Sequence, residues 1–165
     1  MDVATALPTT TFSASQISVT TRYAREFVDL TDFVADHVVE TGVRSGVVII
    51  ASRHTTAAIV VNEYEPELLR DLDAFLGILA PESAPYAHND VPCGPDEHPN
   101  GHAHCQALVL NASVTVPIVD GQPSLGRYQR IFLVELDHSR PRTVQTLVIG
   151  SKGQSDGVAR MGFRD

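Results

Sequence analysis

Two apolar runs in the middle of the chain constrain its fold most strongly. Residues 46–52, GVVIIAS, and residues 57–61, AAIVV, are rich in β-branched side chains and carry no charge. Runs of this length and composition are typical of buried central strands. We therefore expect two strands here, joined by residues 53–56, with polar groups at their ends.

A hairpin-like pairing of these two strands would bring His54 close to Asn62 and Glu63, because antiparallel neighbours lie about 5 Å apart. Alternatively, His54 is a turn residue and Glu63 caps the helix that follows. The residue pattern leaves both interpretations open.

The other segments carry either a strand pattern or a helix pattern. Residues 12–23 alternate as in a strand, and the segment from Leu30 to Gly42 has the three- and four-residue apolar spacing of a helix. A helix over 66–80 begins at a proline, and the pattern further predicts a short helix at 102–110 and strands at 113–119, 128–137 and 143–149. This order predicts an α+β fold dominated by an antiparallel sheet.

Composition limits the class of protein. A chain of 165 residues predicts one domain, with residues 1–11 and 151–165 as loose termini. The net charge of -8 argues against a nucleic-acid partner. No apolar run reaches the roughly 18 residues of a membrane helix, and the first residues do not form a secretory signal. Two cysteines are too few for a disulfide framework, so we expect a cytoplasmic protein.

Residues 85–111 concentrate the groups that could bind a ligand. Four of the seven histidines, three acidic residues and Asn100 lie in this segment, among turn-forming prolines and glycines. Such a set suits a divalent metal or an anionic substrate held by a loop, although a solvated polar loop is the alternative. In a helix His102 and His104 point about 200° apart, so only one of them can belong to the site.

Two carboxylates fall where a charge is costly. Asp71 lies nearer the apolar stripe of its helix than Asp73 does, and Glu135 lies within strand-like sequence. A buried carboxylate needs an arginine, a metal or a proton, so both are candidate functional residues.

Several blocks together resemble one family. They are HTTAAIVVNEYEPELLRDLDAFL, YAHND, and NGHAHCQALVLNASVTVPIVDGQPSLGRYQRIFLVELD with the PR-R that follows. In order and spacing they are similar to the YjbQ-type family, often described as secondary thiamine-phosphate synthases. The resemblance implies a β-sandwich-like α+β subunit with two or three helices, a homotrimer, and sites near subunit boundaries. One departure is Gly-Arg-Tyr-Gln at 126–129, where the family usually has Gly-Thr-Trp-Gln.

The resemblance also implies a set of site residues. At the matched positions we expect catalytic roles for Glu63, Asp71, Gln129 and Glu135, substrate binding by Asn62, Asp90 and Gly126, and metal binding by His54, His88 and His104; Gly121 is a further matched position. Arg127, in the turn that departs from the family pattern, is a further candidate for substrate binding. His98 and His102 fall where family members vary. Three neutral imidazoles would leave one position open on zinc, and the carboxylates would orient them or move protons.

The implied activity joins an aminopyrimidine diphosphate to a thiazole phosphate, with zinc or magnesium as the expected cofactor and a small phosphorylated metabolite as the ligand. No glycine-rich phosphate loop occurs in the sequence. The alternatives are a metal-assisted hydrolase or lyase of such a metabolite, and a non-catalytic trimeric module that binds a metal or ligand.

Overall fold

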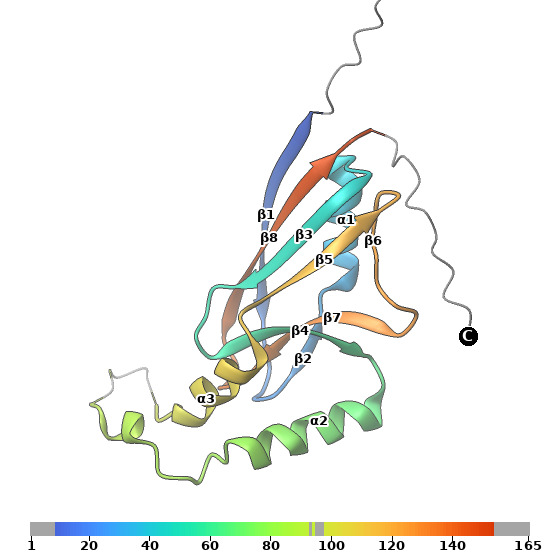
Figure 1. Ribbon diagram of the computed structural model, residues 1–165. Coiled ribbons are helices and arrows are strands. Elements are labelled where there is room, and N and C mark those ends of the chain that lie inside the picture. Colours follow the sequence, from blue (N-terminus) through green and yellow to red (C-terminus); the bar gives the residue numbers. More distant parts are fainter. Residues whose placement is uncertain (1–8, 93, 95–97, 154–165) are drawn as a thin grey trace, which may run out of the picture.

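The computed structural model describes residues 9–92, 94 and 98–153, which form two antiparallel sheets and three α-helices (Figure 1). The predicted α+β class is confirmed. In chain order the elements are β1 (Thr10–Thr20), β2 (Phe27–Asp29), α1 (Thr31–Thr41), β3 (Ser45–Ser52), β4 (Ala57–Glu63), α2 (Pro66–Leu79), a 3-10 turn η1 (Ala87–Asp90), α3 (Gly101–Leu110), β5 (Ser113–Val119), β6 (Gln122–Pro123), β7 (Gln129–Glu135) and β8 (Pro141–Ser151).

The two sheets differ in size. The larger has the strand order β1-β8-β3-β5-β6, and the smaller has the order β2-β7-β4. β3 lies between β8 and β5, as its continuous apolar sequence predicts for a central strand. The glycines of β3 and β8 pair at Gly46 and Gly150, where a Cβ on Gly46 would lie 2.1 Å from the carbonyl oxygen of Ile149.

Strand β7 contributes to two separate cores. Its Ile131 and Leu133 pack in a core with α1 and the five-stranded sheet. Its Phe132 and Val134 point the other way, into a second core with Leu76 of α2 and residues of α3. Successive side chains of a strand point to opposite faces, so the run IFLV satisfies both cores at once. The smaller sheet is thus a layer between the first core and the helices α2 and α3 (Figure 1).

Local sequence sets the helix ends. Gly42, at φ 69°, ends α1 in a left-handed conformation that glycine adopts without strain. Pro66 begins α2, and the Glu65 side chain accepts hydrogen bonds from the backbone N–H groups of Glu67 and Leu68. The cap of this helix is therefore Glu65 rather than Glu63. No helix in the described part of the chain is long and apolar enough to cross a membrane.

The expected hairpin between the two apolar runs is wrong. β3 and β4 lie in different sheets, because β3 pairs with β5 and β8 whereas β4 pairs with β7. His54 precedes β4 while Asn62 and Glu63 end it, so the length of the strand separates them. The short strands β2 and β6, which have no repeating pattern, were not predicted. Thr10 and Thr11 belong to β1, and residues 1–8 and 154–165 lie outside the described residues.

Candidate functional site

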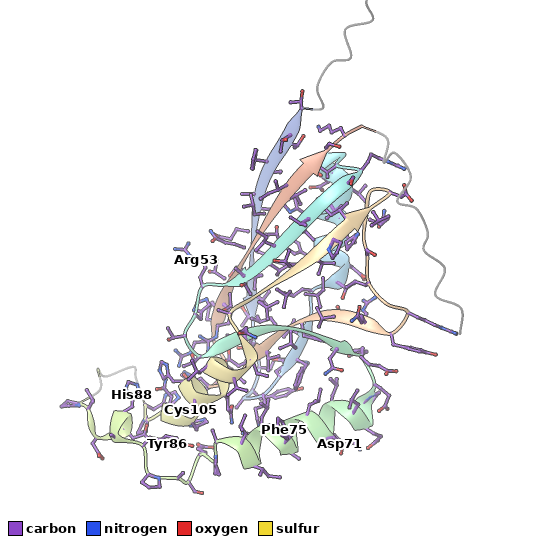
Figure 2. The ribbon with its side chains drawn as sticks, in the orientation of Figure 1. Arg53, Asp71, Phe75, Tyr86, His88 and Cys105 are labelled. Atoms are coloured by element: carbon purple, nitrogen blue, oxygen red, sulfur yellow. The ribbon has the colours of Figure 1, made fainter. Side chains whose placement is uncertain are left out.

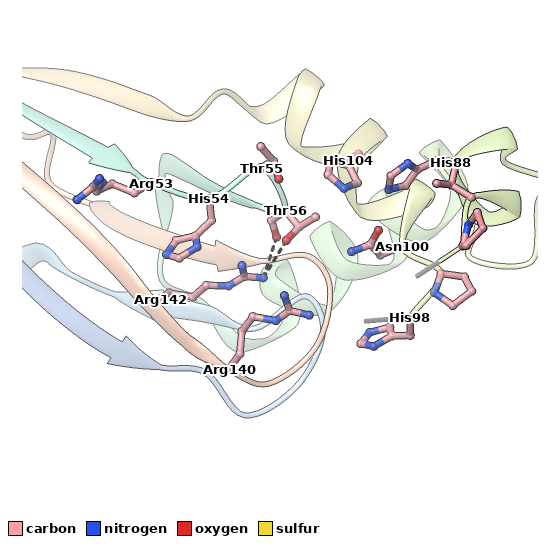
Figure 3. A pocket seen from close by; sticks show the side chains of 13 residues that line it. Arg53, His54, Thr55, Thr56, His88, His98, Asn100, His104, Arg140 and Arg142 are labelled. Atoms are coloured by element: carbon pink, nitrogen blue, oxygen red, sulfur yellow. Dashed lines mark hydrogen bonds between the residues drawn. The ribbon is translucent and has the colours of Figure 1, made fainter. Parts of the chain in front are cut away.

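A cavity of about 430 Å³ lies where the large sheet meets the loop before α3 (Figure 3). We call it the basic pocket, because arginine and histidine dominate the described residues that line it. These are Arg53, His54, Thr55, Thr56, His88, Val91, Pro92, His98, Pro99, Asn100, His104, Arg140 and Arg142. No aspartate or glutamate is among them.

Five segments build the pocket, one of them the loop before α3, which supplies His98, Pro99 and Asn100. Residues 53–56 follow the end of β3, and Arg140 and Arg142 stand at the start of β8, which pairs with β3. η1 supplies His88, and the first turns of α3 supply His104. The sheet therefore holds the arginine side, while the helical segments hold the imidazole pair (Figure 3).

His54 is held by the sheet beside it. Its Nε2 accepts a hydrogen bond of 2.7 Å from the backbone N–H of Thr143. This bond requires an unprotonated Nε2. Burial and the nearby charge of Arg142 lower the pKa of His54. His54 is therefore a neutral side chain with its proton on Nδ1.

His88 and His104 form an edge-on pair, with ring centroids 4.8 Å apart and planes at 79°. Burial, followed by the charge of His88, lowers the pKa of His104. His102, on the next face of α3, is buried and does not line the pocket. Of these two α3 histidines, the pocket lining includes His104 and not His102.

The three predicted metal ligands line one pocket without forming one ligand group. His54, His88 and His104 all contribute to the lining, but Nε2 of His54 is occupied by Thr143. Among the described residues, one group has three His, Cys, Asp or Glu donor atoms within 4.8 Å of one another. That group is His98, Asp137 and His138, and it includes none of the three predicted ligands. The three imidazoles are therefore not arranged around one ion in this structure, and metal binding by this set stays a prediction.

Glu135 is the buried partner of Arg142. The Arg142 guanidinium bonds both carboxylate oxygens, with Nε 2.6 Å from Oε2. Thr21 Oγ1 and the Asp137 backbone N–H also donate to this carboxylate. The sequence predicted that a buried Glu135 needs an arginine, a metal or a proton as its partner. In the structure that partner is an arginine, Arg142. Glu135 does not line the pocket but positions Arg142, which does.

Asp137 lies beneath the pocket wall. Its Oδ2 accepts hydrogen bonds from Asn100 Nδ2 at 3.1 Å and Arg140 Nη2 at 2.8 Å. Its Oδ1 faces His98 and His138. Burial acts to raise the pKa of Asp137, but hydrogen bonds from Asn100 and His138 and the charge of Arg140 outweigh it and hold the pKa low.

The turn at residues 126–129, where substrate binding was predicted, lies outside the basic pocket. Gly126 and Gln129 close it, with the Gly126 N–H donating to Gln129 Oε1 at 2.8 Å. Arg127 is exposed and packs over the ring of Tyr128, 5.3 Å from its centroid. Glu63 pairs with Gln129 across β4 and β7. The lining of the basic pocket includes none of these residues, nor Asn62 or Gly121.

The two predicted aspartates are also outside the basic pocket. Asp71 is exposed on α2, and it lies far from His88 of η1 (Figure 2). The interpretation of Asp71 as the half-buried acid is wrong, because Asp73 is the less exposed of the two and forms an ion pair with Arg25. Asp90 is exposed at the end of η1.

Sequence reasoning missed Arg140, Arg142 and Asp137 as parts of the site. The signal was Glu135, because a carboxylate predicted inside a strand demands a cation, and arginines follow within the same segment.

Comparison with known proteins identifies the family. A family model described as UPF0047 protein YjbQ-like matches residues 15–151. A UPF0047 protein of Methanothermobacter thermautotrophicus is 37% identical over 125 residues, covering 76% of this chain and 83% of the relative. The UPF0047 protein YugU of Bacillus subtilis is 33% identical over 82% of this chain and 96% of its own length.

Solved structures agree. A YbjQ-like protein of unknown function from Sulfolobus solfataricus matches with a TM-score of 0.81 at 34% identity, covering 87% of this chain and 100% of that chain. A hypothetical protein from Aeropyrum pernix matches with a TM-score of 0.77 at 34% identity, covering 84% of this chain and 99% of that chain.

These relatives overturn the expected activity. Their descriptions name UPF0047 proteins and a protein of unknown function, and none of them names thiamine-phosphate synthesis. The assignment as a thiamine-phosphate synthase was therefore wrong, whereas the family itself is confirmed: the chain belongs to the UPF0047 protein YjbQ-like family.

Proposed function

We propose that the basic pocket binds a small molecule through an anionic group, preferably a phosphate. The observation that carries the proposal is the composition of the lining among the described residues, which includes three arginines and four histidines but no carboxylate. Arginine suits phosphate because its planar guanidinium can donate two parallel hydrogen bonds. The cavity of about 430 Å³ is also of the size that encloses a small metabolite.

The charges of the lining are arranged to receive an anion. Arg142 and Arg140 are ion-paired from behind by Glu135 and Asp137. Arg53 is exposed at the end of β3 and forms no ion pair with a described carboxylate, so its charge is free for a ligand (Figure 2). A local excess of positive charge can attract a phosphate although the whole chain carries -8.

The imidazoles add neutral donors and acceptors. The lowered pKa of His104 keeps it neutral near pH 7, and its partner His88 lies against it. A neutral imidazole beside a bound phosphoryl compound can accept a proton, and the imidazolium so formed can deliver it. Any turnover of the ligand would therefore use this pair.

Titration with inorganic phosphate tests the proposal, with heat or amide chemical shifts as the readout and acetate as the carboxylate comparison. Arg53→Gln is expected to weaken phosphate binding about tenfold, as the loss of one charged hydrogen-bonding partner does. Arg70→Gln is the matched control, because Arg70 is also exposed but lies on α2 beside Glu67.

Two results would reject the proposal. One is a failure of the wild-type chain to bind phosphate in the millimolar range. The other is an equal effect of the two substitutions, which would mean that phosphate responds to overall charge rather than to the pocket.

We also propose the homotrimer that the family resemblance implies, with α2 and α3 facing another copy of the chain. Large apolar side chains are exposed on these helices: Ile78 is 78% exposed, Leu108 83% and Val109 57%. Apolar surface of this kind is typical of contacts between subunits.

A further inference from the structure

We propose that His98, Asp137 and His138 form a binding site for a divalent transition-metal ion, with zinc as the best fit. This His98–Asp137–His138 cluster was not predicted from the sequence and differs from the three histidines considered above. Its donor atoms come from the loop before α3 and from the turn between β7 and β8. The turn places Asp137 and His138 side by side, and the loop brings His98 over them.

The distances suit one ion. His98 Nε2 lies 3.0 Å and His138 Nδ1 lies 3.1 Å from the same oxygen, Asp137 Oδ1. All three donor atoms lie within 4.8 Å of one another. A tetrahedral zinc with bonds of about 2.0–2.1 Å separates its ligand atoms by roughly 3.3 Å, so small side-chain shifts would complete the site. Two imidazoles and one carboxylate are also a donor set that zinc accepts with a fourth position left open.

The carboxylate is already held in place. The Asp137 side chain is 1% exposed, and its other oxygen, Oδ2, is fixed by Asn100 and Arg140. Hydrogen bonds of this kind orient the carboxylates that bind metals. The two imidazoles are more open, with 44% of the His98 side chain and 38% of the His138 side chain exposed. An ion from solvent can thus reach a buried, oriented carboxylate through two movable ligands.

Arg140 is the group that competes with the ion. Its Nη2 lies 2.6 Å from Nδ1 of His138, the atom that would bind the metal. Binding therefore requires this guanidinium to leave His138, while its contact with Asp137 Oδ2 can persist. A positive charge so close weakens the affinity for a cation, so we expect a micromolar site rather than a permanent structural zinc.

The cluster lies at the wall of the basic pocket, which His98, Asn100 and Arg140 also line. An ion there would displace Arg140 from the imidazole and add positive charge near the proposed phosphate. The metal proposal does not depend on that phosphate, because every ligand atom belongs to the chain itself.

The test is zinc titration of the full-length chain after chelation, without phosphate, with heat as the readout and X-ray absorption for the ligand atoms. We expect one zinc per chain, bound by nitrogen and oxygen. His98→Asn and His138→Asn are each expected to lose at least about tenfold in affinity, because even outer partners of a metal site cost tenfold to 100-fold. Both side chains are partly exposed, so the fold should survive.

His88→Asn is the matched control, since His88 is an exposed histidine of the same pocket outside the cluster. Its zinc affinity should stay within about twofold of the wild type if the ligands are those named. Zinc binding lost with His88→Asn but kept with His138→Asn would overturn the proposal, as would sulfur in the metal shell or no binding in the micromolar range. Phosphate binding is measured separately on metal-free protein, so failure of either proposal leaves the other testable.

Discussion

Arg142 and Glu135 form an ion pair in which both side chains are removed from solvent, with 2% and 0% of their surface exposed. The pair joins the start of β8 to the end of β7 and so ties the five-stranded sheet to the three-stranded sheet. It also holds the Arg142 guanidinium in place at the wall of the basic pocket. One contact therefore serves the fold and the site together.

Removal of one member of this pair should be costly. Glu135→Ala is expected to lower the free energy of unfolding by about 3–5 kcal/mol, because it leaves the Arg142 charge buried and unpaired. Urea unfolding followed by circular dichroism measures the change. Glu67→Ala, which breaks the exposed pair with Arg70, should leave stability nearly unchanged. A small loss for Glu135→Ala would show that water reaches Arg142 in solution.

Two glycines should respond in opposite directions to alanine. A Cβ at Gly46 would overlap the backbone of Ile149 in the neighbouring strand, so Gly46→Ala is expected to destabilise the chain by about 3 kcal/mol or more. A Cβ at Gly77 would meet nothing within 4 Å, and Gly77 lies inside α2. Gly77→Ala should therefore stabilise the chain by about 0.5–1 kcal/mol. Thermal unfolding of both variants measures the two signs, and similar effects would contradict the β3–β8 pairing.

His54 should titrate below its usual pKa of 6.5. Protonation of Nε2 would break its hydrogen bond from Thr143, so the amide signal of Thr143 should shift with the same midpoint as the imidazole. Because the folded-state pKa is the lower one, the unfolded chain binds the proton first as the pH falls. The stability that His54 contributes is therefore present above about pH 6.5 and is lost as the pH falls through the folded pKa.

NMR titration and urea unfolding between neutral and mildly acidic pH measure both effects. In His54→Asn this part of the pH dependence should disappear, while the part due to His37, whose pKa is also lowered by burial, should remain. A His54 midpoint above the usual value would contradict the hydrogen bond to Thr143.

The proposed homotrimer predicts a mass in solution of about three times the 17.8 kDa of the chain. Leu108→Glu is expected to reduce that mass, because it puts a charge into an apolar contact between copies. Val39→Glu is the control, since Val39 is 54% exposed on α1, away from the α2 and α3 surface. Sedimentation equilibrium decides the matter; a monomeric wild type, or dissociation by Val39→Glu alone, would reject this interface.

The spacing of apolar residues predicted the long helices and strands well, because each of them has a regular division between a more buried and a more exposed face. The alternation in β1 reflects one exposed and one half-buried face, and the apolar stripe of α1 faces a single core. Periodicity could not assign sheets: the runs that became β3 and β4 are equally apolar, and nothing local shows that each pairs with a distant strand. The strand β2 has three residues, too few to show a pattern.

Part of the pocket lining was expected from the family resemblance. It put the histidines at 54, 88 and 104 together, and all three line the pocket. The basic character of the pocket was not foreseen, because it arises from the β8 arginines, which pair from behind with Glu135 and Asp137. The position of His98 over Asp137 likewise depends on two segments 39 residues apart in the chain.

The double burial of β7 has a consequence for how the molecule opens. A strand whose alternate side chains belong to different cores is released only when both cores separate. Amide protons at Ile131, Phe132 and Leu133 should therefore exchange with deuterium only through global unfolding, while that of Gln122 in the edge strand β6 exchanges through local fluctuations.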